Sequence, residues 1–241
     1  MFDRMILVDK PAGMSSFGVV ARVRRVLSEE AGRKIKVGHT GTLDPFATGL
    51  LILMTGKNTK KCQEFLKLDK VYEAEVRLGF TSTTGDPEGE ITARAGAGGA
   101  GAGVGASDDV GAGEQKSDAR PSLTEVKKVV QSFVGEISQQ LPRFSAVKIN
   151  GQRAYKLARK GEEVEMPRRK VTIYEAEVLS YDYPKLRIRC HVSSGTYIRT
   201  LGEDIGERLG TGAYLTALRR IRIGDYDVSD AVTLTEFGIL D

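Results

Sequence analysis

The sequence of 241 residues has few of the side chains that build metal sites and disulfide frameworks. It contains two cysteines, Cys62 and Cys190, and two histidines, His39 and His191. None of them has the spacing of a zinc site or of a Cys-x-x-Cys motif. We therefore expect no bound metal, and we interpret both thiols as residues of the core.

The sequence also lacks long apolar runs. No segment approaches the length of about 20 apolar residues that a membrane span needs. Residues 1–10 have no charged region followed by an apolar stretch and a small-residue cleavage site, so we expect no export. With 40% hydrophobic and 28% charged residues, the composition is typical of a globular protein. These absences predict a cytoplasmic protein with no membrane contact.

No phosphate-binding loop of the nucleotide hydrolases is present, because Gly56 and Lys57 are followed by Asn58 where that motif needs Ser or Thr.

The net charge of +4 is small, but the basic residues are clustered. Each cluster is either a solvated surface or a contact for phosphates, and the sequence leaves both readings open. The clusters are Arg22, Arg24, Arg25, Arg33, Lys34 and Lys36; Lys57, Lys60 and Lys61; Arg153, Lys156, Arg159 and Lys160; Arg168, Arg169 and Lys170; and Arg219, Arg220 and Arg222.

The most informative segment is the glycine-rich stretch 38–49, which presents a single carboxylate, Asp44, just before an apolar run. Its glycines permit positive φ, and Pro45 biases Asp44 toward an extended conformation. The run 50–54 that follows has the length of an interior strand. Asp44 is then either a turn residue that bonds local backbone or a reactive carboxylate at the mouth of a core.

The hydrophobic periodicity indicates strands mixed with helices, without strict alternation. We predict an α+β fold with a mixed, mostly antiparallel central sheet flanked by helices. A capping box at Ser122 and Glu125 opens one helix, with Leu123 on its apolar face. The expected strands are 5–8, 50–54, 71–78, 170–180 and 185–192, and the expected helices begin at Ser15 or Ser16, Asn58, Ser122 and Tyr197.

Residues 93–119 break this pattern, because 95–113 are mostly Gly and Ala. Such a segment cannot bury enough apolar surface to offset its ordering entropy. We expect a flexible surface insertion in a single catalytic domain that spans 1–241. Because the sequence ends soon after residues 231–234, we expect no C-terminal RNA-binding module.

Six segments, taken in order, resemble the bacterial tRNA pseudouridine-55 synthase family, known as TruB. They are 8–16, 37–49, 71–86, 145–148 with 151–159, 195–202 and 218–220. The resemblance implies the pseudouridine synthase fold and the isomerisation of uridine to pseudouridine in the T-loop of tRNA, with base flipping and without a cofactor. Residues 148–160 correspond to an RNA-gripping insertion.

The resemblance also assigns catalytic roles. Asp44 matches the essential aspartate, which acts either as a nucleophile at the sugar or as a base at the adjacent ribose carbon. Arg199 matches the arginine that pairs with this aspartate, and a guanidinium would favour its ionised form. Tyr72 matches the tyrosine that stacks on the target base.

Other matched residues are expected to bind the RNA. His39 matches the loop histidine that helps hold the flipped RNA, and Leu218 corresponds to an apolar wall. Lys10, Tyr197 and Lys148 lie in matching motifs near the site or in the gripping insertion. We expect the T-arm of tRNA as partner, a monomer, and no obligatory protein partner. Two alternatives stay open: a tRNA-binding or RNA-folding protein, and the same chemistry on another RNA.

Overall fold

The computed structural model describes residues 2–94, 120–145, 147–149, 151–159 and 165–238. Within these ranges, nine strands form one sheet whose main path runs β1-β3-β12-β4-β11-β10-β7, with β2 beside β3 and β13 beside β12. Every pairing is antiparallel except that of β12 with β3. The strands are β1 (Met5–Lys10), β2 (Val37–His39), β3 (Thr48–Thr55), β4 (Lys70–Leu78), β7 (Gly135–Gln140), β10 (Arg168–Asp182), β11 (Lys185–Val192), β12 (Ala213–Ile223) and β13 (Tyr226–Asp227).

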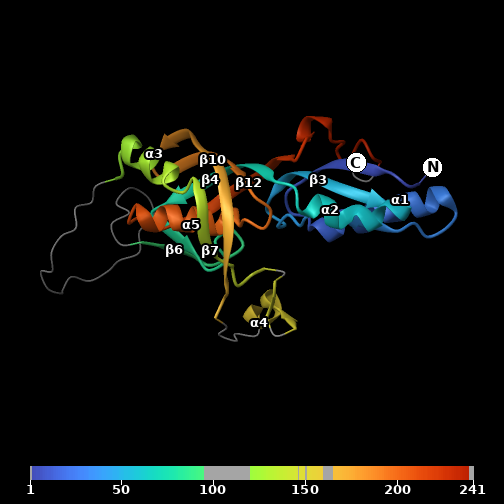
Figure 1. The fold of residues 1–241 in the computed structure, drawn as a ribbon, viewed down its shortest axis with the longest axis horizontal. Helices are drawn as coiled ribbons and strands as arrows, with labels where there is room; N and C mark the ends of the chain where they lie inside the picture. Colours follow the sequence, from blue (N-terminus) through green and yellow to red (C-terminus); the bar gives the residue numbers. More distant parts are fainter. Residues whose placement is uncertain (1, 95–119, 146, 150, 160–164, 239–241) are drawn as a thin grey trace, which may run out of the picture.

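One end of the elongated molecule is built on β1 and β3, beside the two chain ends (Figure 1). Helix α1 (Ser16–Ala31) packs on one face of these strands, and Ser15 caps it by accepting from the N–H of Gly18. The 3-10 helix η1 (Gly56–Lys61) and helix α2 (Cys62–Leu66) lie against the other face. Because side chains alternate along β3, its buried run 50–54 supplies both of these cores.

The other end is built on β4, β11, β10 and β7. Helices α3 (Leu123–Gln131) and α5 (Ile198–Arg208) cover the same face of these strands and share one large apolar cluster with them (Figure 1). The predicted capping box opens α3, since Ser122 accepts from the N–H of Glu125 and Glu125 accepts from the N–H of Ser122. Such a box satisfies two amides that would otherwise lack partners.

Short elements complete the fold. Strands β5 (Phe80–Ser82) and β6 (Ile91–Ala93) form a hairpin beside β12. Strands β8 (Lys148–Ile149) and β9 (Gln152–Arg153) precede helix α4 (Ala154–Arg159), and this segment stands away from the sheet (Figure 1). The 3-10 helix η2 (Val228–Asp230) follows β13.

The predicted fold class is confirmed, and some local predictions are wrong. Leu123 is 45% exposed, because contact of α3 with the sheet begins one turn later at Val126. The basic helix expected over 58–66 is a 3-10 turn followed by one α-helical turn. Strand β12 was not predicted at all. The Gly/Ala-rich stretch 95–119 lies outside the described residues. In the described ranges, no helix is both long and apolar enough to span a membrane.

Candidate active site

Asp44 lies in the connection between β2 and β3, and two anchors hold that connection in place. The Ser16 hydroxyl donates to the carbonyl of Leu43 at 2.9 Å and accepts from the N–H of Leu43 at 2.8 Å. On the other side of Asp44, the carbonyl of Pro45 accepts from the N–H of Gly13 at 2.8 Å. The first turn of α1 and the turn that follows β1 therefore fix the backbone on both sides of the carboxylate.

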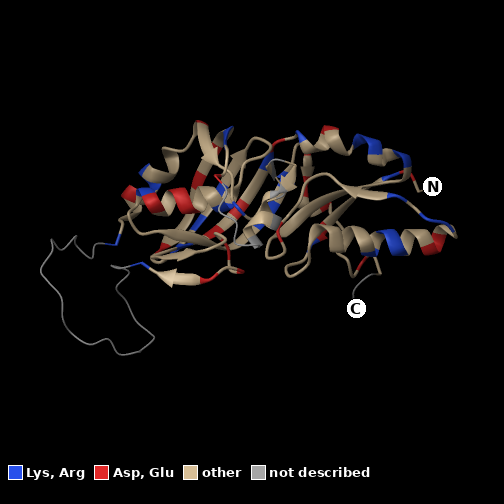
Figure 2. Cartoon of the chain, turned by 90° about the horizontal axis from the view of Figure 1, so that it is seen from below, with Lys and Arg blue, Asp and Glu red and all other residues tan. Residues whose placement is uncertain are grey.

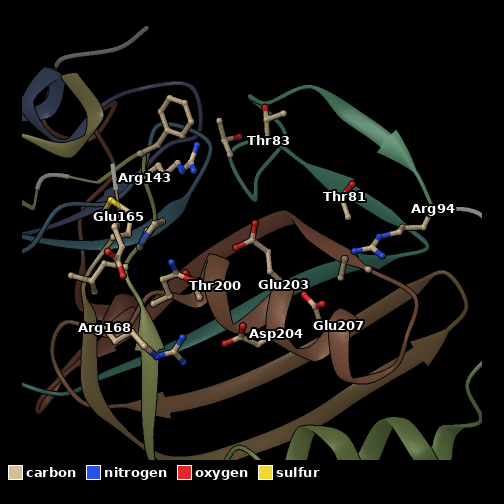
Figure 3. Close-up of a pocket in the computed structure, with 18 residues that line it drawn as sticks. Thr81, Thr83, Arg94, Arg143, Glu165, Arg168, Thr200, Glu203, Asp204 and Glu207 are labelled. Carbon is tan, nitrogen blue, oxygen red and sulfur yellow. The ribbon is translucent and has the colours of Figure 1, made fainter. Parts of the chain in front are cut away.

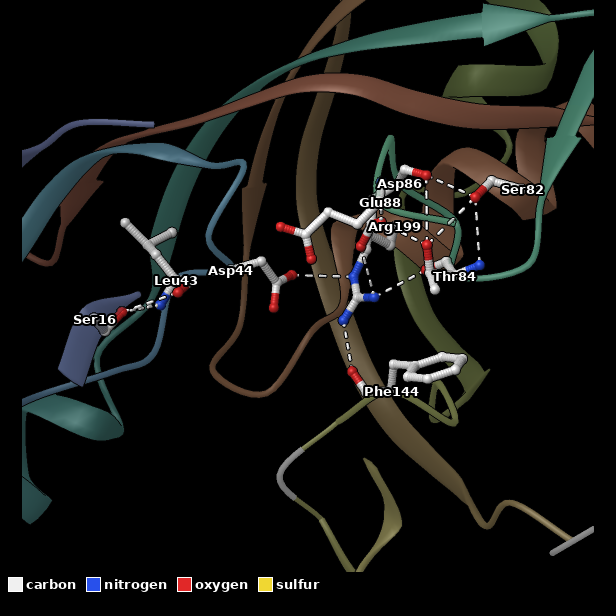
Figure 4. Close-up of polar contacts among 9 residues, drawn as sticks. All are labelled: Ser16, Leu43, Asp44, Ser82, Thr84, Asp86, Glu88, Phe144 and Arg199. Carbon is white, nitrogen blue, oxygen red and sulfur yellow. Dashed lines mark hydrogen bonds and ion pairs between the residues drawn. The ribbon is translucent and has the colours of Figure 1, made fainter. Parts of the chain in front are cut away.

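Arg199, in the first turn of α5, forms an ion pair with Asp44. Its Nε lies 3.0 Å from Oδ2 of Asp44, and its Nη1 donates to Oδ2 of Asp86 at 3.0 Å. Two backbone carbonyls hold the rest of the guanidinium, those of Thr84 and Phe144, each at 2.9 Å (Figure 4). The side chain of Arg199 is only 4% exposed, whereas that of Asp44 is 34% exposed. The Arg199 guanidinium is thus held on several sides, and the Asp44 carboxylate is partly exposed to solvent.

Burial raises the pKa of Asp44, and the neighbouring charges act on it in both directions. The Arg199 and Lys10 cations oppose the rise, and the Asp86 carboxylate adds to it. A carboxylate with a raised pKa is a stronger base, while the adjacent guanidinium favours its ionised form and fixes its orientation. This arrangement suits a group that must accept a proton or attack a carbon.

Three buried cations lie on β1, β12 and β4, and each is bonded to backbone carbonyls. Lys10 Nζ donates to Pro11, Met14 and Pro45 at 2.6 to 3.2 Å. The Arg220 guanidinium donates to Leu50 and Gly41, and Lys70 donates to carbonyls at the end of α2.

Burial lowers the pKa of both lysines to about 8, and the Arg220 charge adds to this effect in each case. Both lysines therefore hold their protons less tightly than exposed lysines do.

An apolar wall stands next to the carboxylate. Leu43 and Ala47 from the loop share a buried cluster with Leu218 of β12. Tyr72 of β4 is partly buried and packs against this cluster. Through this cluster the loop that carries Asp44 packs onto the middle of the sheet.

The remaining predicted site residues, other than Lys10, lie in three different elements of the fold. His39 ends β2, and its Nδ1 accepts from the N–H of Gly41 at 3.3 Å; burial, with the Arg220 charge, lowers its pKa. Tyr197 caps α5, but its ring packs in a separate cluster at the base of the α4 segment. The amide of Gln139 bonds both backbone groups of Tyr197. The backbone of Lys148 lies in β8, and its side chain is outside the described residues.

A cavity of about 620 Å³ lies on the other side of Arg199, between α5, the β5–β6 hairpin and the base of the α4 segment (Figure 3). Carboxylates of α5 point into it, and arginines stand at its borders. Burial raises the pKa of Glu203 to about 7, and the Arg199 charge opposes that rise. The charged lining residues are Glu203, Asp204, Glu207, Glu165, Arg94, Arg143 and Arg168.

Sequence reasoning missed part of the site. Asp86 entered the sequence analysis only as the last residue of the segment 71–86, without a role, yet its side chain is 4% exposed and holds Arg199. The signal was a carboxylate enclosed by Gly85, Pro87 and Gly89. Arg220 was grouped with a basic surface cluster, but it is 1% exposed because β12 runs through the middle of the sheet. Within the described residues, no group of three or more His, Cys, Asp or Glu side chains is arranged to hold a metal ion.

Comparison with known proteins places this geometry in a family. A family model described as "TruB family pseudouridylate synthase (N terminal domain)" matches residues 24–99 and 101–198. A second, described as "tRNA pseudouridylate synthase B C-terminal domain", matches 199–239. The chain belongs to the TruB family of pseudouridylate synthases. The expectation that it carries no further C-terminal module stays a prediction.

Curated relatives agree with this assignment. The chain is 44% identical over 237 residues to the tRNA pseudouridine synthase B of Cupriavidus pinatubonensis, covering 96% of this chain and 66% of that protein. It is 41% identical over 230 residues to the enzyme of the same name from Endomicrobium trichonymphae, with 95% and 89% covered. The chain thus spans about two thirds of the length of the Cupriavidus protein.

Solved structures share the fold. A chain in the crystal structure of a Cbf5-Nop10-Gar1 complex superposes with a TM-score of 0.64 at 28% identity, covering 96% of this chain and 52% of that one. A chain in the structure of an H/ACA RNP bound to a substrate RNA containing 2'-deoxyuridine superposes with a TM-score of 0.62 at 27% identity, covering 96% and 51%.

Proposed function

We propose that this chain is an isomerase that converts uridine to pseudouridine at position 55 in the T-loop of tRNA. The observation that carries the proposal is the pair of Asp44 and Arg199, a partly exposed carboxylate 3.0 Å from a buried guanidinium, in a chain of the TruB family. In the reaction, the bond between uracil N1 and the ribose breaks, the base turns, and C5 bonds to the same ribose carbon. C5 then loses its proton and N1 gains one, so the atoms balance without a cofactor.

Asp44 is the proposed catalytic group, by one of two routes. As a nucleophile it would bond to the ribose carbon and release uracil; as a base it would take a proton from the adjacent ribose carbon. Both routes need an ionised carboxylate, and the buried Arg199 guanidinium favours that form. Tyr72 is proposed to stack on the uracil, and Leu218 to close the pocket beside it.

The RNA is proposed to enter with its target base flipped, at an unstacking cost of a few kcal/mol. His39 would hold the flipped form. Lys10 would hold the Asp44 loop through the carbonyl of Pro45. Tyr197, at the start of α5, and Lys148, in β8, are proposed to contact the RNA. We further propose that the enzyme acts in the cytoplasm as a monomer and needs no protein partner.

An assay for pseudouridine tests this function. Full-length tRNA and an isolated T-loop hairpin would each be incubated with the wild type, with Asp44→Asn, and with Asp230→Asn as a control that removes an exposed carboxylate. We expect product from the wild type and the control, and none from Asp44→Asn.

Other outcomes separate the alternatives. Equal product from wild type and Asp44→Asn would refute the assignment of Asp44. Tight tRNA binding with no product from the wild type would favour an RNA-folding protein. Product formed only on a different RNA would favour pseudouridine synthesis on that RNA.

A further inference from the structure

Helix α1 carries a shallow groove that the proposed reaction does not use. The groove has a volume of about 490 Å³ and is lined by four cationic side chains, those of Arg24, Arg25, Arg33 and Lys34, with a single carboxylate, Glu29. We call these five residues and the space between them the α1 groove. Blue segments follow the helices at the end of the molecule that holds the N-terminus (Figure 2).

These four cations have no acidic partner in the described part of the chain. None of them takes part in an ion pair there, although Glu29 follows Arg25 by four residues on α1, the spacing at which helical pairs form. Four positive charges that line one groove without an ion pair repel one another. An anionic ligand in the groove would relieve that repulsion.

An exposed aromatic ring stands beside the groove. Phe17 is 64% exposed, the highest value among the large apolar side chains that remain exposed in the described residues. The guanidinium carbon of Arg24 lies 5.9 Å from its ring centroid. A ring and a guanidinium side by side form the kind of surface on which RNA bases stack.

The groove is connected to the reaction centre. Helix α1 begins at Ser16, which bonds the backbone of Leu43 directly before Asp44. The helix has 16 residues, so it leads away from that point over about 24 Å. The cations therefore lie along and beyond the helix that starts at the Asp44 loop, outside the site that contains Asp44.

We propose that the α1 groove binds phosphates of the tRNA outside the T-loop, with Phe17 stacking on an adjoining base or sugar. This proposal rests on the proposed function, since it takes the substrate to be tRNA. Arginines can hold phosphate oxygens through two parallel N–H groups, and each neutralised phosphate releases counterions. The groove would thus add affinity for whole tRNA without touching the reacting uridine.

The test compares a triple variant, Arg24→Ala, Arg25→Ala and Arg33→Ala, with a control that removes three exposed lysines elsewhere, Lys127→Ala, Lys128→Ala and Lys185→Ala. Equilibrium affinities for full-length tRNA and for the T-loop hairpin would be measured across a salt series, with thermal melts to confirm folding.

For the groove variant we expect about a tenfold or greater loss of affinity for tRNA and a salt dependence reduced by about 2 to 3 in log–log slope. Affinity for the hairpin and the single-turnover rate on it should match those of the wild type. Phe17→Ala alone should weaken tRNA binding about tenfold, because a stacking contact is lost.

Two results would overturn the proposal. If the groove variant binds tRNA as the control does, the groove does not contact the RNA, and an acidic protein surface becomes the better occupant. If the hairpin loses as much affinity as the tRNA, the contact is within the T-loop arm. Failure of the proposed function would be seen separately, as a wild type that makes no pseudouridine.

Discussion

Replacing Arg199 with methionine should cost both stability and turnover, and the structure gives the size of the stability loss. The side chains of Arg199 and Asp86 are each 4% exposed. Removing one member of a buried ion pair typically costs about 3 to 5 kcal/mol, because the other charge stays buried without its partner. Asp86 keeps its bonds from the Thr84 hydroxyl and the Glu88 N–H, which favours the low end, about 3 kcal/mol.

Two carbonyls, of Thr84 and Phe144, would also lose their donors, which adds about 1 kcal/mol. We therefore expect Arg199→Met to lower the free energy of unfolding by about 4 kcal/mol at pH 7. The double variant Arg199→Met with Asp86→Asn no longer buries the charge, so it should recover about 2 kcal/mol. Both the single and the double variant should turn over substrate more slowly than the wild type, because Asp44 lacks its cation in each of them.

The stability loss can be measured directly. Urea unfolding at pH 7 should show a gap of about 4 kcal/mol between wild type and Arg199→Met, and a gap of about 2 kcal/mol between wild type and the double variant. A gap below about 1 kcal/mol for Arg199→Met would refute the reasoning.

Three further substitutions have expected outcomes. Burial lowers the pKa of Lys70 to about 8, so from pH 8 to 10 the unfolded chain binds more protons than the folded one. In denaturant titrations, the free energy of unfolding of the wild type should therefore rise relative to that of Lys70→Met by about 1 kcal/mol per pH unit. A difference that does not change with pH would contradict this. A Cβ at Gly49 would lie 2.3 Å from the carbonyl oxygen of Arg220, at φ of +102°, so Gly49→Ala should cost about 3 kcal/mol or more in the same assay; a loss within 0.5 kcal/mol, the ordinary range of surface changes, would count against it. Ser122→Ala removes the capping box of α3 and should lower the free energy of unfolding by about 1 kcal/mol without affecting turnover. An unchanged free energy of unfolding would mean that water replaces the cap.

The fold could be predicted from the sequence where one local pattern decides the structure. The strand over 71–78 alternates in the sequence and in burial, and the capping box at Ser122 is a short-range signal that the structure confirms. Strand β12 has no such pattern, because three arginines interrupt its apolar residues. Its place in the centre of the sheet depends on partners from β4 and β3 that are distant in the chain.

The same limit applies to the candidate site. The glycine-rich loop indicated Asp44 as a residue of interest, and the resemblance to the TruB family supplied the pairing with Arg199. Nothing local in the sequence indicates that Asp86 and the carbonyl of Phe144 converge on that guanidinium across 113 and 55 residues of chain. Likewise, a basic cluster in the sequence cannot distinguish the buried Arg220 from an exposed neighbour.

The two hydrogen bonds between Ser16 and Leu43 have a consequence for motion. Leu43 is 3% exposed and Ser16 is 1% exposed, so the Leu43 amide can exchange its hydrogen only when the first turn of α1 separates from the loop. The backbone directly before Asp44 therefore moves with a helix of 16 residues rather than as a free loop. In a deuterium-exchange experiment, the Leu43 amide would be a slow probe placed one residue from the carboxylate.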